Sequence, residues 1–324
     1  MVVLIVGLGS MGKRRARLIK AAYPQIKIIG VDKSLERIKE AESLLNIKTY
    51  ESMDEAIKVE KPSAAFISTS PLTHSSIIQE CLKNNIHVFT ELNLVNDGYD
   101  NIIKLANERQ LKLFVSSTLL YRNDIKYITT EVKEKKVNYI YHVGQYLPDW
   151  HPWESYKNYF VGKKRTNGCR EIFAIDLPWI INAFGEVESF NVMKDKSSNL
   201  EIDYNDNYLV SFKHKNGNKG IVCVDVVSRK AVRTLEVFSE EIHMFWDGTP
   251  NGLYKYDLEE KTNKKIETYT SIDKDNNYSD NIIENAYLDE IITFFSYIEN
   301  EIVPLYTIKD DIKVLALIDE IEEE

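Results

Sequence analysis

The sequence predicts an α/β fold in two parts: an N-terminal doubly wound parallel sheet, then a C-terminal α+β domain with a large, open and mainly antiparallel sheet. Three observations predict it. Apolar runs alternate with helix-forming segments through residues 1–120, which is the order of a parallel sheet with crossover helices. Glycines in G-x-G-x-x-G spacing follow the first apolar run. Beyond residue 121, strand patterns separated by turn residues dominate.

The first 23 residues give the strongest signal. Residues 2–6 are apolar and mostly β-branched, as in a central strand buried on both faces. The run Gly7-Leu8-Gly9-Ser10-Met11-Gly12 follows, and residues 13–23 carry apolar side chains at helical intervals. Strand, glycine turn and helix in this order are the context of a dinucleotide-binding Rossmann domain.

Each glycine of this turn has a physical role in binding a dinucleotide. Gly7 permits the tight turn, Gly9 lets the backbone approach a pyrophosphate, and Gly12 lets helix and strand pack closely. Ser10 and Met11 open the helix, whose N-terminal N–H groups attract the phosphates. The sequence therefore predicts a cofactor site at this turn.

The second apolar run, residues 26–31, ends at Asp32. An acidic residue at this place accepts hydrogen bonds from an adenosine ribose 2′-hydroxyl and repels a 2′-phosphate, which predicts NAD. Lys33 and Arg37 keep NADP open as an alternative, because either cation suits a phosphate.

The rest of the N-terminal part keeps the same alternation. Helical patterns cover 35–45, 52–59, 75–84 and 99–109, and strand patterns cover 64–68, 86–90 and 112–116. Ligands of such sheets bind beyond the carboxyl ends of the strands. We therefore expect Ser70, His74 and Glu91, which follow two of these strands, to join the cofactor site.

The pattern changes near Tyr121, which divides a domain at 1–120 from a substrate-binding and oligomerisation domain at 121–324. We expect the last helix to pack back on the first domain. Helical patterns cover 124–135, 170–184 ending at Gly185, 281–299 and 307–321, and strand patterns cover 137–144, 189–193, 208–213, 220–227, 234–239, 242–246, 253–256 and 265–269.

Composition limits the class of protein. The 324 residues carry a net charge of −9, which argues against nucleic-acid or anionic-membrane partners, and no apolar run is long enough to span a membrane. We expect a cytoplasmic protein. The 3 cysteines and 6 histidines show no metal-ligand spacing along the sequence, so no metal site is expected.

These features together resemble the Gfo/Idh/MocA family of sugar and polyol oxidoreductases. The matching parts are the glycine motif, Asp32, the turn from Ser70 to His74, residues 87–91 and the change to an open sheet. The resemblance implies a Rossmann domain for NAD(P), a second domain for substrate, and a homodimer or homotetramer formed through the open sheet. Residues 144–154 resemble the branch that accompanies surface-sugar and nonulosonate synthesis.

Two positions depart from that family. Its members carry Glu-Lys-Pro after the fifth strand, where lysine helps to bind substrate and move its proton, whereas this chain has Glu91-Leu92-Asn93. The family also places an Asp and a His one helical turn apart at the start of a later helix. Here those places fall at Glu171 and Ile175.

Hydride removal from a carbinol needs a base, so a dehydrogenase must replace the missing groups. His151 is our first candidate, Glu171 the second, and Asp176 lies on the same predicted helix. The alternative is structural: the two carboxylates pair with Arg170 and Arg165, and His151 makes a loop hydrogen bond.

An aromatic and basic segment is the expected substrate site. Aromatic faces suit sugar C–H surfaces, and guanidinium groups suit carboxylates or phosphates. In the alternative, the aromatic residues pack a domain junction and the basic residues are solvated. The candidates are Trp150, Trp153, Tyr159, Arg165 and Arg170.

The sequence therefore predicts an NAD(P)-dependent oxidoreductase that transfers hydride to or from a carbohydrate, a nucleotide sugar or sugar acid, in surface-polysaccharide or nonulosonate biosynthesis. The alternative is a dinucleotide-binding redox sensor or partner subunit that has lost hydride transfer. Leu92 and Ile175 favour this alternative.

Overall fold

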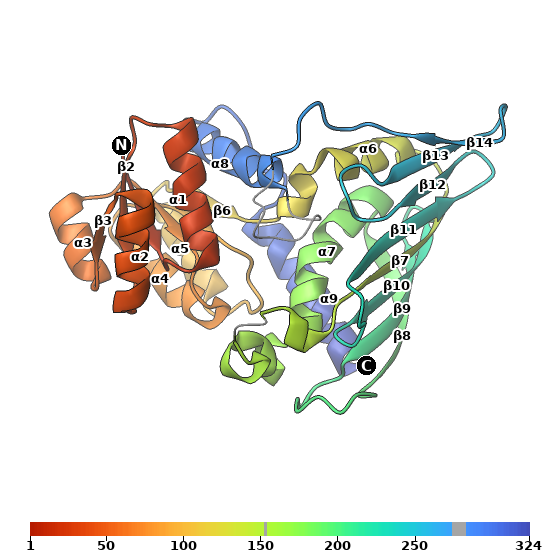
Figure 1. Cartoon of the computed structure of the whole chain (residues 1–324), viewed down its shortest axis with the longest axis horizontal. Coiled ribbons are helices and arrows are strands. Elements are labelled where there is room, and N and C mark those ends of the chain that lie inside the picture. Colours follow the sequence, from red (N-terminus) through yellow and green to blue (C-terminus); the bar gives the residue numbers. More distant parts are fainter. Residues whose placement is uncertain (152–153, 274–282) are drawn as a thin grey trace. The chain divides into compact units, whose positions relative to one another are not determined.

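A computed structural model describes residues 1–151, 154–273 and 283–324. The chain forms two compact units, each with its own sheet (Figure 1). The first unit comprises Met1–Thr118 and Tyr287–Leu315, and the second comprises Leu119–Ala286 and Ala316–Glu324. None of the helices in the described ranges has an apolar stretch long enough to cross a membrane.

The first unit has a six-stranded sheet in the order β3-β2-β1-β4-β5-β6, with every pair parallel. The β1 strand lies between β2 and β4, which explains its continuous apolar run. The sequence pattern did not predict β3, because three residues are too few to show a period. The elements are β1 (Val2–Val6), α1 (Ser10–Ala22), β2 (Lys27–Val31), α2 (Leu35–Leu45), β3 (Lys48–Tyr50), α3 (Met53–Glu60), β4 (Ala64–Ile67), α4 (Pro71–Lys83), β5 (His87–Thr90), α5 (Tyr99–Glu108) and β6 (Leu113–Val115).

Aromatic side chains fill the core of the first unit beside the last three strands. Phe66, Phe89 and Phe114 are register partners on β4, β5 and β6, and their rings stack with centroids 4.7 and 4.8 Å apart. Phe294 of α8 (Glu284–Ile298) meets Phe66 edge-on at 5.3 Å. This packing fixes the strand ends at which Glu91 and Ser116 begin the following loops.

The second unit has an eight-stranded sheet in the order β14-β13-β12-β11-β7-β10-β9-β8, in which β7 and β10 pair in parallel and the other pairs are antiparallel. Helix α7 packs against one face of this sheet (Figure 1), with Phe184 stacked on Tyr139 and Trp179 edge-on to Tyr141. The elements are the 3₁₀ helix Thr118–Tyr121, α6 (Asn123–Val132), β7 (Asn138–Gly144), the 3₁₀ turns Leu147–Asp149, Tyr156–Asn158, Phe160–Gly162 and Lys164–Thr166, α7 (Gly168–Phe184), β8 (Val187–Asp195), β9 (Asn207–His214), β10 (Lys219–Asp225), β11 (Val232–Phe238), β12 (His243–Trp246), β13 (Leu253–Asp257), β14 (Thr262–Lys265), and α9 (Ile308–Glu323), whose residues are shared between the units.

The predicted fold class is confirmed, with a parallel sheet followed by a mostly antiparallel one. One predicted strand, 265–269, was wrong in position, because β14 is Thr262–Lys265. Asp257 Oδ1 accepts the N–H groups of Glu259 and Glu260, and Lys261 adopts a positive φ of 54°. This tight turn starts the return strand three residues early. In the predicted helix 281–299, residues 281–282 lie outside the described ranges, and α8 begins at Glu284.

Candidate functional site

The glycine turn has the shape that a dinucleotide needs. Gly7 has φ +92°, and a Cβ at this position would lie 2.6 Å from the Ser68 carbonyl oxygen. A Cβ on Gly12 would lie 1.8 Å from the Gly7 carbonyl oxygen, so only glycine lets α1 approach the turn. At Gly9 the nearest atom to an added Cβ, Arg37 Nη1, is 4.0 Å away. The open space above Gly9 is room for a phosphate.

The start of α1 carries no competing negative group. Ser10 and Met11 lie in its first turn, which has no acidic residue. The N-cap residue is Gly9, so the N-cap position supplies no side-chain hydrogen bond to this end of the helix. The N–H groups of a first helical turn lack intrahelical acceptors and carry partial positive charge. This end of α1 therefore fits a pyrophosphate.

Asp32 is anchored to the same turn. Its Oδ2 accepts the N–H of Leu8 at 2.8 Å, and its Oδ1 accepts the N–H of Ser34 at 2.8 Å. Each carboxylate oxygen retains a lone pair for a ribose hydroxyl. Arg37 Nη1 lies 3.8 Å from Oδ2, so the carboxylate that favours NAD has a cation beside it.

Ser70 and His74 belong to the turn into α4. Ser70 is the residue before the helix, and its carbonyl oxygen accepts the Thr73 N–H at 2.9 Å. His74 is buried, with Nε2 2.9 Å from the Thr69 carbonyl oxygen and Nδ1 2.9 Å from Asn93 Oδ1. Burial lowers the pKa of His74, although both contacts oppose that effect. Both ring nitrogens are engaged, so His74 shapes the loop.

Asn93, which stands where the family has proline, connects His74 to a buried carboxylate. Its side chain hydrogen-bonds to Asp311 of α9, which also accepts from the hydroxyls of Tyr99 and Tyr306. Burial raises the pKa of Asp311 to about 6, against the lowering effect of these three donors. The missing lysine is therefore replaced by a partly buried Leu92 followed by a residue tied into the core.

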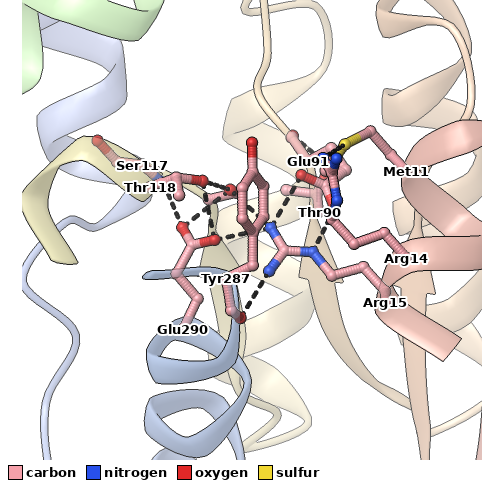
Figure 2. Close-up of polar contacts among 10 residues, drawn as sticks. Met11, Arg14, Arg15, Thr90, Glu91, Ser117, Thr118, Tyr287 and Glu290 are labelled. Carbon is pink, nitrogen blue, oxygen red and sulfur yellow. Dashed lines mark hydrogen bonds and ion pairs between the residues drawn. The ribbon is translucent and has the colours of Figure 1, made fainter. Parts of the chain in front are cut away.

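Glu91 is held by an arginine that sequence reasoning missed (Figure 2). Arg15 of α1 donates from Nε to Glu91 Oε1 at 2.7 Å and from Nη2 to Oε2 at 3.1 Å. Its Nη2 also lies 2.7 Å from Glu290 Oε2, and its Nη1 donates to the Tyr287 carbonyl oxygen at 3.0 Å. The only signal in the sequence was the position of Arg15 on the apolar face of an expected helix.

Glu290 completes this cluster within the first unit, as Figure 2 shows. Its Oε1 accepts from the Ser117 N–H at 2.8 Å and the Ser116 hydroxyl at 2.9 Å, and its Oε2 accepts from Thr118 at 3.0 Å. Burial lowers the pKa of Arg15, but the two carboxylates outweigh burial and the pKa is raised overall. Glu91 is thus fixed in position at the carboxyl end of β5.

In the second unit, α7 carries two of the predicted catalytic carboxylates. The side chain of Asn167 caps it by accepting the Arg170 N–H at 2.7 Å. Asp176 is buried, and its Oδ1 accepts from the Tyr141 hydroxyl at 2.6 Å and from the Trp179 indole at 2.9 Å, and pairs with Arg233. This position suits an anchor between α7 and the sheet, and a catalytic role for Asp176 stays a prediction.

The two predicted substrate-binding arginines differ in environment. Arg170 is buried and pairs with two carboxylates of α9, Asp319 at 2.7 Å and Glu322. Arg165 is exposed at the end of the loop. Arg165 is therefore the more solvent-exposed of the two.

His151, Tyr159 and Glu171 come together in the second unit. The rings of His151 and Tyr159 stack at 4.6 Å with an angle of 25°. Burial raises the pKa of Tyr159, and the charge of Glu171 adds to this effect. Burial also raises the pKa of Glu171 to about 7 and lowers that of His151. We call these three residues the acid–base cluster.

Two atoms of the acid–base cluster are enclosed without a hydrogen bond. Within the described ranges, Glu171 Oε2 and the Tyr159 hydroxyl have no partner. Trp150 lies in the preceding segment, and its indole donates to the Gln145 carbonyl oxygen at 3.0 Å. Trp153 lies outside the described residues.

Comparison with known proteins agrees with the fold. Residues 1–117 match the model of the Gfo/Idh/MocA family, described as "Oxidoreductase family, NAD-binding Rossmann fold". No curated protein matches the sequence.

Solved structures resemble the whole chain. UDP-N-acetylglucosamine 3-dehydrogenase GnnA from Acidithiobacillus ferrooxidans is 16% identical with a TM-score of 0.78, covering 100% of this chain and 97% of its own. The WlbA dehydrogenase from Chromobacterium violaceum, in complex with NADH and UDP-GlcNAcA, is 15% identical with a TM-score of 0.75, covering 99% and 92%. An oxidoreductase from Agrobacterium radiobacter, in complex with NAD+, L-tartaric acid and magnesium, is 11% identical with a TM-score of 0.83, covering 100% and 96%.

These identities show a shared fold and no more. The family match rests on the first unit, whose glycine turn and Asp32 geometry fit NAD. Residues 1–117 thus match the NAD-binding Rossmann domain of the Gfo/Idh/MocA oxidoreductase family.

Proposed function

We propose that the chain transfers hydride between NAD and a hydroxyl-bearing carbon of a carbohydrate, a nucleotide sugar or a sugar acid, in surface-polysaccharide or nonulosonate biosynthesis in the cytoplasm. One observation carries the proposal: Glu171 has an enclosed oxygen with no partner in the described ranges and a pKa of about 7. A carboxyl group of this kind transfers protons at neutral pH.

The first unit supplies the cofactor's binding groups. The start of α1 and the space above Gly9 hold the pyrophosphate, and Asp32 accepts from the ribose hydroxyls. NAD, when bound, accepts or donates the hydride. Arg15 keeps Glu91 in a single position at the end of β5.

The acid–base cluster supplies the proton transfer. As the carbonyl forms, Glu171 takes the proton of the substrate hydroxyl, and in the reverse direction it returns that proton. A pKa of about 7 leaves both protonation states populated, so Glu171 serves either direction. His151, whose pKa is lowered by burial, is neutral and accepts a hydrogen bond or a proton beside it.

The substrate class follows from the residues around the cluster. The Tyr159 and Trp150 rings are partly exposed and suit sugar C–H groups, and the exposed Arg165 suits a phosphate or carboxylate. Among the structures of the same fold, one acts on a UDP-sugar and another was solved with UDP-GlcNAcA. Both observations support an anionic sugar.

The test begins with a fluorescence titration of the purified chain with NADH and NADPH, which also decides the NADP alternative. A single-turnover assay against nucleotide sugars and sugar acids follows. We expect Glu171→Gln and His151→Ala to slow turnover by roughly 10²–10⁴-fold while cofactor affinity stays unchanged. Glu188→Gln, an exposed carboxylate on β8, is the control. Unaltered turnover in both cluster variants would contradict the assignment.

The competing function is a dinucleotide-binding redox sensor or partner subunit. It is favoured by the apolar residues Leu92 and Ile175 at the places of the family's lysine and histidine. Tight NADH binding without oxidation by any sugar in the panel would select this alternative.

We also propose that copies of the chain associate through the open sheet face as a homodimer or homotetramer. Large apolar side chains on its strands are exposed, among them Ile140 at 45%, Ile221 at 47% and Phe245 at 44%. Such a patch marks an interaction surface. Light scattering coupled to size exclusion measures the assembly, and a monomer at micromolar concentration would refute this proposal.

A further inference from the structure

Three metal-ligating side chains converge on one face of the second unit's sheet: His142 of β7, and Cys223 and Asp225 of β10. One donor atom from each lies within 4.8 Å of the others. Because β7 and β10 pair in parallel, Cys223 stands opposite His142. Cys223 and Asp225 are two positions apart on β10, so their side chains share a face.

Contacts among the three side chains already join them. His142 Nε2 lies 2.8 Å from Asp225 Oδ2, and Cys223 also hydrogen-bonds to His142. A tetrahedral zinc ion would hold such donors about 3.3–3.6 Å apart. His142 Nε2 and Asp225 Oδ2 would have to separate by about 0.5–0.8 Å to hold the ion.

The surrounding backbone is built to hold the carboxylate. Asp225 Oδ1 accepts the N–H groups of Val227 at 2.9 Å and Ser228 at 2.7 Å, and the Ser228 hydroxyl donates to Oδ2 at 2.9 Å. A Cβ on Gly144 would lie 2.3 Å from Oδ2, so a glycine is needed there. Hydrogen bonds of this kind orient the ligands of metal sites.

We propose that His142, Cys223 and Asp225 bind a divalent transition-metal ion of the zinc class. Sulfur, nitrogen and oxygen donors together are the set that zinc prefers, and three protein ligands leave one coordination position for water or a ligand. Binding displaces the protons that the thiol and the imidazole carry. The site lies apart from the acid–base cluster in sequence and uses none of its residues.

The chain provides matched controls. His243 lies 2.9 Å from Glu236 on the same sheet, an exposed histidine–carboxylate pair. Of the three cysteines, Cys81 and Cys169 are buried and Cys223 is partly exposed. A thiol reagent therefore reports on Cys223 in the folded protein, and because Cys223 shares the open sheet face with Ile221, the rates with and without Zn²⁺ are compared at one protein concentration and one state of assembly.

The test uses the full chain after chelator dialysis, titrated with Co²⁺ and then Zn²⁺. We expect one equivalent of Co²⁺ per chain with a sulfur-to-cobalt charge-transfer band, which Zn²⁺ removes by displacement. Cys223→Ser should abolish the band, and His142→Gln and Asp225→Asn should weaken binding at least about tenfold. His243→Gln should change nothing.

The proposal is overturned if no band forms, or if Cys223→Ser binds the metal as the wild type does. A second measurement follows the reaction of Cys223 with a chromogenic thiol reagent. Zn²⁺ should slow this reaction at least about tenfold, and an unchanged rate overturns the proposal. Both readouts are independent of sugar turnover, so failure of the proposed reaction leaves this test intact.

Discussion

Each unit holds a polar cluster, and the two clusters differ in how their groups are satisfied. In the first unit, Arg15 is bonded to Glu91 and Glu290, and both Glu290 oxygens accept further hydrogen bonds. In the second unit, Glu171 Oε2 and the Tyr159 hydroxyl are enclosed and have no partner in the described ranges.

The difference separates a supporting structure from a ligand-facing one. A buried polar group left without a hydrogen bond costs about 1–3 kcal/mol, whereas a fully bonded cluster fixes its own geometry. The charged groups of the Arg15 cluster are paired without a ligand. The acid–base cluster has unused hydrogen-bonding capacity, which a substrate hydroxyl would use.

The largest effect is expected from removing the cation of the first cluster. Arg15→Met leaves Glu91 and Glu290 without their shared partner, and Glu290 is fully buried. Breaking a buried pair in this way costs about 3–5 kcal/mol. Urea unfolding followed by circular dichroism measures the loss. Arg17→Met, on the exposed face of α1, should cost less than about 0.5 kcal/mol. Equal losses in the two variants would contradict the interpretation of a supporting cluster.

A smaller effect is expected from the pH dependence of stability. The pKa of Glu171 is raised to about 7 in the folded chain from 4.5, so the folded state binds the proton more tightly than the unfolded state. The free energy of unfolding should therefore fall as pH rises from about 4.5 to about 7. Glu171 contributes about 1–3 kcal/mol of that fall.

Glu171→Gln isolates this contribution. Asp311 changes stability in the same direction with a pKa of about 6, but it is present in both proteins. Relative to the wild type, the variant should be more stable at about pH 8 than at about pH 5, as measured by urea unfolding. A difference that does not vary with pH would show that Glu171 titrates normally.

The presence of a parallel sheet followed by a mainly antiparallel sheet could be predicted from the sequence, because local patterns encode the strands of each. The run at 2–6, the glycine turn and Asp32 specify a central parallel strand and its crossover. The short β3 was not predictable, because three residues are too few to show a strand pattern. The position of β14 was not predictable, because it depends on the turn that Asp257 forms.

Contacts among candidate site residues could be expected from the sequence only where the residues lie in one segment. His151, Tyr159 and Glu171 lie within one segment, and their proximity follows from chain connectivity. The Arg15–Glu290 pair spans 275 positions, and His142 lies opposite Cys223 only through strand register. Spacing rules cannot detect such contacts, because pairing of distant segments creates them.

The smallest effect is expected at Tyr159, which is partly exposed, in contrast to the buried Tyr141. The Tyr141 hydroxyl donates to Asp176 at 2.6 Å and accepts from Arg233 at 2.7 Å, so Tyr141→Phe should cost about 1.5–3 kcal/mol. Tyr159→Phe removes a hydroxyl that has no partner in the described ranges, so it should not lower the free energy of unfolding. Urea unfolding of the two variants side by side measures the contrast. A loss in Tyr159→Phe equal to that in Tyr141→Phe would mean that the folded chain itself satisfies the Tyr159 hydroxyl, and the acid–base cluster would then have no capacity reserved for substrate at that atom.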